Sequence, residues 1–378
     1  MRPLTAYLKP TNGCSVGCSH CYLPESVRAN KNRMSLDVVA ASAKLLSDMA
    51  ARQRAPGIHV VWHGGEPLGV PVEWFLDAGS ILDELIPGHS ESIQTSLIPY
   101  RTEHAELIRR RFDGGIGSSM DFTQRTIKGS SESYASLWMR KVEAARADGL
   151  VVIPGTVPSK AEIDRGREMV DWFVERDFTA FNVDRYNHFS PSGFVRDEAR
   201  PSNAEHARFL DGLLSALLER LDRTGRAPAV NVAVAAIAGT LLDAPGDRWG
   251  TTCQHAFLVV EPDGSTNSCP DRSATETPFS SVSSGFAGFE ASEGRRTWIR
   301  TQERSHRTND CLSCRYSGWC RSGCPITPNG SRDGEDECSG YRSHLDRISS
   351  MAESDSGREL LLAYLRMAGR NDDAPLTS

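Results

Sequence analysis

The sequence predicts an α/β protein in which a partial (β/α) barrel is followed by a small, cysteine-rich domain. Two observations lead to this fold class. Short apolar runs alternate with longer amphipathic stretches over the first two thirds of the 378 residues, and seven of the ten cysteines lie in the last third. Strand-then-helix alternation implies parallel strands joined by right-handed crossovers, so about six such units predict a partial barrel. A doubly wound open sheet is the alternative that periodicity leaves open.

The expected barrel strands are short apolar segments, at residues 5–8, 58–62, 93–97, 115–120, 150–153 and 180–184. A helix is expected over residues 36–51, where Ser35 can cap the N-terminus and Asp37 favours the positive end of the helix dipole. A second amphipathic helix is expected over residues 203–223, and residues 340–369 also have a helical pattern.

These patterns divide the chain into four expected segments. They are a barrel in residues 1–200, a helical linker in 201–250, a cysteine-rich domain in 251–345, and a C-terminal helix and tail in 346–378. The third segment has few apolar residues and needs bound metal to hold it together.

Composition excludes several classes of protein. The chain has 43 basic and 49 acidic residues, and its net charge of −6 argues against a nucleic-acid partner. No apolar run approaches the length of a membrane span, and the N-terminus lacks the apolar region of a signal peptide. We therefore expect a cytoplasmic protein, in which clustered thiols indicate metal or redox chemistry rather than disulfides.

The first cysteine group directly follows the first expected strand. Cys14, Cys18 and Cys21 form a CxxxCxxC triplet. Three thiolates on one tight loop can bind three irons of a [4Fe–4S] cluster and leave the fourth iron open to an external ligand. A zinc site with a distant fourth ligand, such as His20 or His63, is the alternative.

This triplet, in this position, resembles the signature of the radical S-adenosylmethionine (radical SAM) superfamily. The resemblance implies a partial (β/α)6 barrel in which the open iron chelates the amino and carboxylate groups of SAM. It also implies that reductive cleavage of SAM yields a 5′-deoxyadenosyl radical, which abstracts a hydrogen from the substrate. A flavodoxin-type or ferredoxin-type electron donor is a further implied partner.

Other segments agree with the resemblance. Gly64-Gly65-Glu66-Pro67 closes the second expected strand and resembles the family's GGEP motif, whose backbone receives the SAM amino group. Because glycine lets backbone approach a ligand, we expect Gly65→Val to weaken SAM binding and leave the iron content intact. The resemblance also implies SAM contacts at the ends of later strands, by Ser96, Ser119 and Arg125. Arg125 would pair with the SAM carboxylate, and a surface arginine is the alternative.

The spacing of the other seven cysteines resembles the motif of the SPASM domain, which carries two auxiliary iron–sulfur clusters. The resemblance implies that auxiliary cluster I is bound by Cys253, Cys269 and Cys324, and auxiliary cluster II by Cys311, Cys314, Cys320 and Cys338. Three [4Fe–4S] clusters then use all ten cysteines. Cluster I would need a non-cysteine ligand: a water, a side chain such as Asp271, or a substrate group. A pair of zinc knuckles and purely structural clusters are the alternatives.

Three residues are candidates for catalysis. Asp271 follows Cys269 by two residues, and in related sulfatase-maturing enzymes an acidic residue beside the matching cysteine acts as a base. Asp184 and Tyr186 lie at the end of the last expected barrel strand, where side chains reach the open face of a barrel and can contact substrate. Ordinary salt bridging at the rim is the alternative for this pair.

The resemblance implies a maturase that modifies a ribosomally synthesised peptide, with a cyclophane-type carbon–carbon crosslink as the favoured outcome. Thioether formation, epimerisation, decarboxylation and formylglycine formation are other outcomes, and dehydrogenation of a small-molecule alcohol is an alternative substrate class. An iron–sulfur electron-transfer module is the non-enzymatic alternative. Because Cys14 lies so near the N-terminus, we expect a precursor peptide to be recognised by a separate leader-recognition protein, the C-terminal segment or the barrel mouth.

Overall fold

A computed structural model describes residues 3–186, 197–246, 249–250, 252–273, 277–308, 311–324 and 338–369. These residues form two compact units. The first unit contains residues from 3–152 and 252–300, and the second contains residues from 153–186, 197–250 and 301–369, each with the gaps just given.

The first unit is built on a sheet with the strand order β12-β11-β10-β1-β3-β4-β5. Its parallel strands are β1 (Leu4–Thr11), β3 (Ile58–Gly64), β4 (Ser90–Thr95), β5 (Gly115–Ser119) and β10 (Phe257–Val260). The short strands β11 (Ser265–Asn267) and β12 (Ser280–Ser281) extend it in antiparallel fashion. Fully buried side chains such as Leu8, Val60 and Trp62 form its core.

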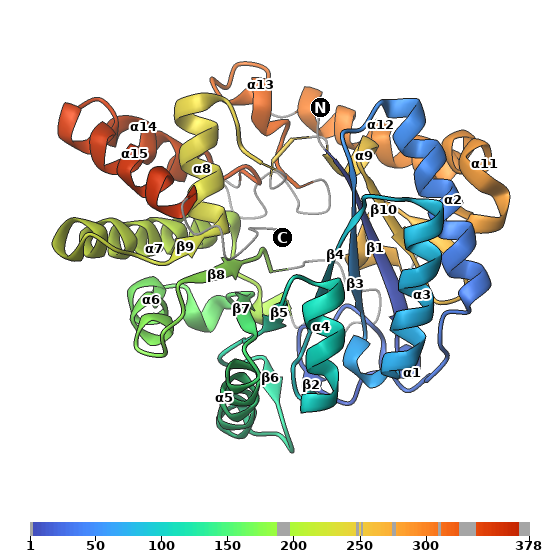
Figure 1. Ribbon diagram of the computed structural model, residues 1–378. Coiled ribbons are helices and arrows are strands. Elements are labelled where there is room, and N and C mark those ends of the chain that lie inside the picture. The colour runs from blue at the N-terminus through green and yellow to red at the C-terminus, as the bar shows by residue number, and fades with distance from the viewer. Residues whose placement is uncertain are drawn as a thin grey trace. The chain divides into compact units, whose positions relative to one another are not determined.

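Three helices cover one face of β1, β3 and β4 (Figure 1): α2 (Leu36–Gln53), α3 (Val72–Leu85) and α4 (Ala105–Arg111). Ser35 is the N-cap of α2, as expected, and its hydroxyl accepts a hydrogen bond from the Val38 N–H at 3.3 Å. The other elements of this unit are α1 (Glu25–Arg28), α5 (Ser131–Ala147), α9 (Thr252–His255), α10 (Pro270–Ser273), α11 (Gly285–Ala291) and the paired strands β2 (Gly17–Cys18) and β6 (Arg125–Thr126).

The four expected strands of this unit are present, with different ends. The largest difference is at β4, which ends at Thr95 and does not reach residue 97. Leu97 has a positive φ of 64°, and the backbone N–H of Ser96 donates to Glu66 Oε2 at 2.9 Å. The chain therefore turns at the point where the apolar pattern alone predicts a continued strand.

Strand β10 lies in the segment that was expected to form the cysteine-rich domain. It pairs in parallel with β1, with Thr5 opposite Phe257 and Leu8 opposite Val260. The first part of that segment therefore continues the sheet of the expected barrel segment.

The second unit contains most of β7 (Val151–Thr156), which is followed in parallel order by β8 (Ala180–Val183) and β9 (Ala229–Val230). Its helices are α6 (Gly166–Val174), α7 (Asn203–Thr224), α8 (Asn231–Leu242), α13 (Ser317–Cys320), α14 (Arg342–Met351) and α15 (Asp355–Gly369). Helix α12 (Glu293–Thr308) contributes residues to both units. Helix α7 confirms the expected helix at 203–223 almost to the residue.

The helical pattern of residues 340–369 corresponds to two helices, not one. Helix α14 ends at Met351 and α15 begins at Asp355. The break is stabilised by Ser354, whose hydroxyl accepts a hydrogen bond from the Gly357 N–H at 3.1 Å. A serine in this position starts a new helix. The expected tail at 370–378 lies outside the described residues.

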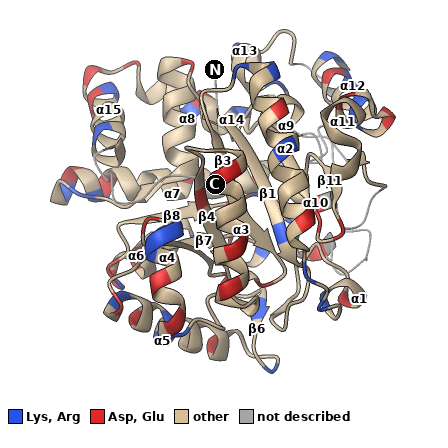
Figure 2. Cartoon of the chain, turned by 45° about the vertical axis from the view of Figure 1, so that its right-hand side comes forward, with Lys and Arg blue, Asp and Glu red and all other residues tan. Residues whose placement is uncertain are grey.

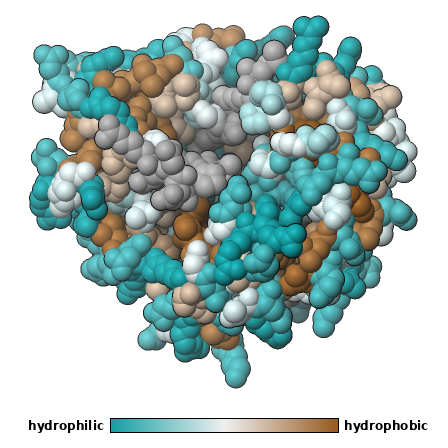
Figure 3. Space-filling view, viewed as in Figure 1, coloured by the Kyte–Doolittle hydropathy of each residue, from teal (hydrophilic) through white to brown (hydrophobic). Residues whose placement is uncertain are grey.

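Charged residues of both signs are interspersed over the helices (Figure 2). On the face shown in Figure 3, hydrophilic areas alternate with smaller hydrophobic ones. Among the described residues, no helix has the length and apolar character that crossing a membrane requires.

Candidate functional site

The loop between β1 and α2 carries the first cysteine group, and hydrogen bonds hold it on both sides. The Cys14 N–H donates to Arg28 O at 3.1 Å, and Arg28 Nη1 donates to Val16 O at 3.1 Å. Cys18 lies in β2 and pairs with Arg125 of β6. Hydrogen bonds within the protein therefore fix the conformation of this loop.

The three thiols of this loop are free and lie near one another. Burial raises the pKa of Cys18 to about 12; the neighbouring thiols act in the same direction and Arg125 acts against them. Burial also raises the pKa of Cys14, and Cys21 contributes. The coupling of these pKa values shows that the three sulfurs are neighbours.

The sulfurs of this loop do not lie as close together as the ligands of a single zinc ion do. Ligands of one tetrahedral zinc lie about 4 Å apart. Among the described residues, one group of three potential ligand atoms lies within 4.8 Å of one another, and none of these atoms belongs to a cysteine. The two histidines considered as zinc ligands have other partners: His20 Nε2 lies 3.5 Å from Asp121 Oδ2, and His63 Nδ1 lies 3.4 Å from the Tyr22 hydroxyl. The donor set of Cys14, Cys18 and Cys21 therefore fits a [4Fe–4S] cluster.

The Gly64–Pro67 turn packs directly on the cysteine loop. Gly64 has a φ of +122°, the Gly65 N–H donates to Thr11 O at 2.9 Å, and the Glu66 N–H donates to Gly13 O at 3.0 Å. A Cβ on Gly65 would lie 2.4 Å from Asn12 O and 2.5 Å from Gly13 O. A valine here would displace the loop that carries Cys14, so from the structure we expect Gly65→Val to disturb iron binding as well as SAM binding.

Glu66 and Ser96, both expected to contact SAM, bind each other. The buried Glu66 carboxylate accepts hydrogen bonds from the Ser96 N–H and from the hydroxyls of Ser96 and Thr95. It also accepts one from the Leu68 N–H at 3.1 Å, at the start of the 3₁₀ turn Pro67–Gly69. These side chains join the ends of β3 and β4, and a SAM contact by either stays a prediction.

The other two expected SAM contacts lie at the end of β5 and in β6. Ser119 Oγ accepts a hydrogen bond from Gln94 Nε2 at 3.1 Å. Arg125 donates from Nε to Asp121 Oδ2 at 2.5 Å and from Nη1 to Cys18 Sγ at 3.3 Å. The alternative of a surface arginine is wrong, because only 15% of its side chain is exposed.

Sequence reasoning missed a buried lysine beside this loop. Lys9 is fully buried in β1; its Nζ lies 2.7 Å from Glu261 Oε1, donates to Pro270 O at 3.1 Å and lies 4.8 Å from the centre of the Tyr22 ring. Glu261 also accepts from Asn12 Nδ2 at 2.7 Å. The signal was a lysine directly after the expected strand at residues 5–8, since a lysine buried with that strand requires a partner for its charge.

The candidate base Asp271 lies near this lysine. It belongs to α10, is partly buried, and is close enough to Tyr22 to contribute to the raised pKa of that phenol, whose first cause is burial.

Burial, reinforced by Lys9 and Arg125, lowers the pKa of His63 to about 3. Near pH 7 the first unit therefore presents a neutral imidazole beside the turn that follows β3.

In the second unit, the structure brings together the four cysteines expected to bind auxiliary cluster II. Burial raises the pKa of Cys320 to about 12, with contributions from Cys338 and Cys311, while Cys311 and Cys314 contribute to the raised pKa of Cys338. A Cβ on Gly340 would lie 2.4 Å from Cys320 Sγ, so this glycine lets backbone pass close to the sulfurs. Four cysteines that form no disulfide and lie together in this way fit a closed cluster.

The remaining predicted site residues are divided between the units. Cys253 lies in α9 and Cys269 precedes α10, both in the first unit, whereas Cys324 belongs to the second. This ligand set stays a prediction.

Asp184 follows β8 and donates its N–H to Thr156 O at 2.8 Å, and Tyr186 is buried. Their contact with substrate also stays a prediction.

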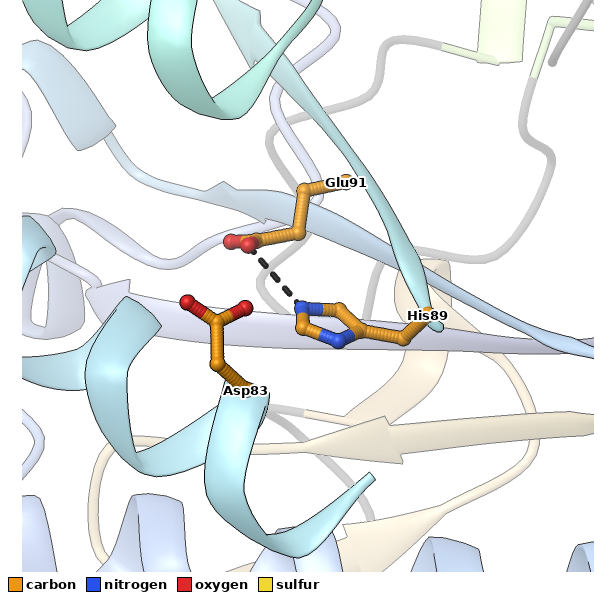
Figure 4. A group of neighbouring side chains, drawn as sticks. All are labelled: Asp83, His89 and Glu91. Carbon is orange, nitrogen blue, oxygen red and sulfur yellow. Dashed lines mark hydrogen bonds and ion pairs between the residues drawn. The ribbon is translucent and has the colours of Figure 1, made fainter. Parts of the chain in front are cut away.

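A second group of potential metal ligands, Asp83, His89 and Glu91, is drawn in Figure 4. The guanidinium of Arg111 lies among them: it donates to Asp83 Oδ2 at 2.6 Å and contacts Glu91 Oε1, and its Nη2 lies 3.5 Å from His89 Nε2. The cation of this group is therefore an arginine, and we interpret it as an ion-pair network that ties α3 to β4.

No known family model matches the chain. An uncharacterized protein of Archaeoglobus fulgidus is 28% identical over 117 residues, which are 31% of this chain and a quarter (25%) of that relative's length. Among solved structures, anSMEcpe with bound AdoMet (SAM) has a TM-score of 0.74 at 17% identity and covers 96% of this chain and 99% of its own. Streptococcus suis SuiB bound to precursor peptide SuiA has a TM-score of 0.61 at 13% identity, covering 86% of this chain and 72% of SuiB.

At these identities the likeness shows the fold. The expected α/β fold with a large parallel sheet is confirmed, and it is shared with anSMEcpe over almost the whole chain.

Proposed function

We propose that the chain is a radical SAM enzyme that uses SAM to abstract a hydrogen from a peptide. The observation that carries this proposal is the arrangement of Cys14, Cys18 and Cys21 on one loop, with the glycine turn after β3 hydrogen-bonded to the same loop. Three thiolates would leave one iron of a bound cluster open, and the glycine turn next to the loop offers backbone groups without side chains to a ligand of that iron. When bound, such a cluster supplies the electron that cleaves SAM to methionine and a 5′-deoxyadenosyl radical.

Each part of this site has a separate task. The three cysteines hold the cluster, and the turn at Gly64 and Gly65 would receive the amino group of SAM. Ser119 would contact the SAM ribose or carboxylate. Lys9, with its ion pair to Glu261, holds the backbone at Pro270 against β1 and so positions the candidate base Asp271.

A peptide is the proposed substrate. Two proteins of the same fold were crystallised with peptides: anSMEcpe with the Cp18Cys peptide, and SuiB with its precursor peptide SuiA. We favour a cyclophane-type crosslink, which removes two hydrogens from the peptide: one as the atom abstracted by the 5′-deoxyadenosyl radical, the other as a proton lost to a base and an electron that an auxiliary cluster would accept. Thioether formation removes the same two hydrogens but consumes a thiol, and epimerisation leaves the mass unchanged.

The same proposal includes two auxiliary clusters, held by the seven C-terminal cysteines. The grouping of Cys311, Cys314, Cys320 and Cys338 supports a closed cluster II. Cys253, Cys269 and Cys324 would hold cluster I with one iron open to a water, to Asp271 or to substrate. A flavodoxin-type or ferredoxin-type donor, a separate leader-recognition protein and a cytoplasmic location complete the proposal.

The test of this function is release of 5′-deoxyadenosine. Protein reconstituted without oxygen is incubated with SAM and a strong reductant, and the nucleoside is quantified by chromatography. We expect steady release from the wild type and none from the variant in which Cys14, Cys18 and Cys21 are replaced by Ala. The matched control replaces Cys311 and Cys314 by Ala, and it should lose iron but still cleave SAM. Equal release from the wild type and the first variant would exclude the proposed site.

A further inference from the structure

A buried arginine reaches the first cysteine group. Nη1 of Arg125 donates to Cys18 Sγ at 3.3 Å, and its Nε donates to Asp121 Oδ2 at 2.5 Å. Both side chains are largely shielded from water, with 15% of Arg125 and 1% of Asp121 exposed. At this depth the charge of a guanidinium is screened far less than at a surface.

Backbone pairing fixes this contact. Arg125 and Cys18 face each other in the antiparallel ladder of β6 and β2, where Gly17 is opposite Thr126. A hydrogen bond from the Thr126 hydroxyl to Gly17 O at 3.1 Å and one from the Ser19 N–H to Gln124 O at 2.8 Å flank the pair. The two segments therefore cannot slide without breaking several hydrogen bonds, and the guanidinium is held against the sulfur.

We propose that Arg125 is a positioning and tuning residue for the first cluster: its hydrogen bond to Cys18 raises the reduction potential of the cluster, and Asp121 moderates this effect. The inference rests on the proposed function, because it requires a cluster on Cys14, Cys18 and Cys21. Reduction adds a negative charge to the cluster. A cationic donor on a ligand sulfur stabilises the reduced form, and hydrogen bonds to the sulfurs are among the features that set such potentials.

This role differs from the SAM contact expected from the sequence. An arginine that only bound the SAM carboxylate would leave the cluster potential unchanged when SAM is absent. A potential measured without SAM therefore separates the two roles.

The experiment is a redox titration of reconstituted, SAM-free protein followed by EPR. The signal of the first cluster is identified as the one missing from the variant without Cys14, Cys18 and Cys21. We expect Arg125→Gln to shift the midpoint potential to more negative values and Arg125→Lys to shift it less. Asp121→Asn keeps an oxygen acceptor for Arg125 but removes the opposing charge, so it should shift the potential to more positive values. The exposed Arg140 of α5 supplies the control, since Arg140→Gln should leave the potential unchanged.

Iron analysis keeps the outcomes distinct. Wild-type protein without iron on the first three cysteines would contradict the proposed function itself. Iron-loaded Arg125→Gln with the wild-type potential would overturn the tuning role and leave the proposed function standing. If Arg125→Gln does not retain the cluster, Asp121→Asn decides: a positive shift supports the inference, and an unchanged or more negative potential overturns it.

Discussion

Glu66 shows how one side chain can connect the two strand ends at the candidate site. Its carboxylate accepts hydrogen bonds from the Leu68 N–H, the Ser96 N–H and two hydroxyls. Sequence reasoning identified Glu66 from the GGEP resemblance but assigned it to SAM. The partners Thr95 and Ser96 could not be foreseen, because they lie at the end of β4, about 30 residues along the chain, and only the parallel pairing of β3 with β4 brings them to Glu66.

We predict that Glu66→Ala destabilises the folded protein by about 2–4 kcal/mol, because it leaves several buried donors without an acceptor. Glu66→Gln keeps one acceptor oxygen and should cost less. Urea unfolding of the reconstituted protein measures both values. A Glu66→Ala variant as stable as the wild type would show that these hydrogen bonds do not hold the turn.

His63 is a second single residue with an effect on stability: it makes the stability of the folded protein depend on pH. Its folded-state pKa is lowered to about 3 by burial, then by Lys9 and Arg125, from an ordinary value of 6.5. Between these values the unfolded chain binds a proton that the folded chain does not, so stability falls as the pH falls below 6.5. At pH 5.5 this difference amounts to about 1.4 kcal/mol.

We therefore predict that His63→Gln loses less stability than the wild type when the pH is lowered from 7.5 to about 5.5. Urea unfolding at both pH values gives the two losses. Equal losses in wild type and variant would mean that folding does not lower the pKa of His63.

At the scale of elements, the sequence predicted helix boundaries correctly where an N-capping serine determines the start of the helix. Ser35 was expected to cap α2 and does so, and α7 matches its expected span. Ser354, between α14 and α15, is also an N-capping serine, but the helical pattern of the residues around it predicted one continuous helix. The pairing of β10 with β1 had no local signal, because it joins residues about 250 positions apart.

We predict that Ser35→Ala destabilises the protein by about 1 kcal/mol, because the Val38 N–H at the start of α2 loses its acceptor. The matched control is the exposed Ser47 in the interior of the same helix. There, alanine should be neutral or stabilise by about 0.5 kcal/mol, since its helix propensity is higher. Thermal or urea unfolding of the two variants should show opposite or clearly unequal effects.

At the scale of the whole molecule, the grouping of the C-terminal cysteines was the most predictable feature, since these residues repeat at short spacings in the sequence. The structure groups Cys311, Cys314, Cys320 and Cys338 as that spacing implied. The residues around the ligands were less predictable: Lys9, Glu261 and Asp121 are brought to the first cysteine loop by sheet register and tertiary pairing. The positions of Cys253, Cys269 and Cys324 as one ligand set stay a prediction.

The central claim is that ten cysteines bind three iron–sulfur clusters, and metal analysis tests it most directly. Protein purified and reconstituted without oxygen should contain about 12 iron and about 12 sulfide per chain. Replacing Cys14, Cys18 and Cys21 by Ala should remove about a third of each and leave the rest in place. Stoichiometric zinc without iron, in protein never exposed to oxygen, would contradict the account.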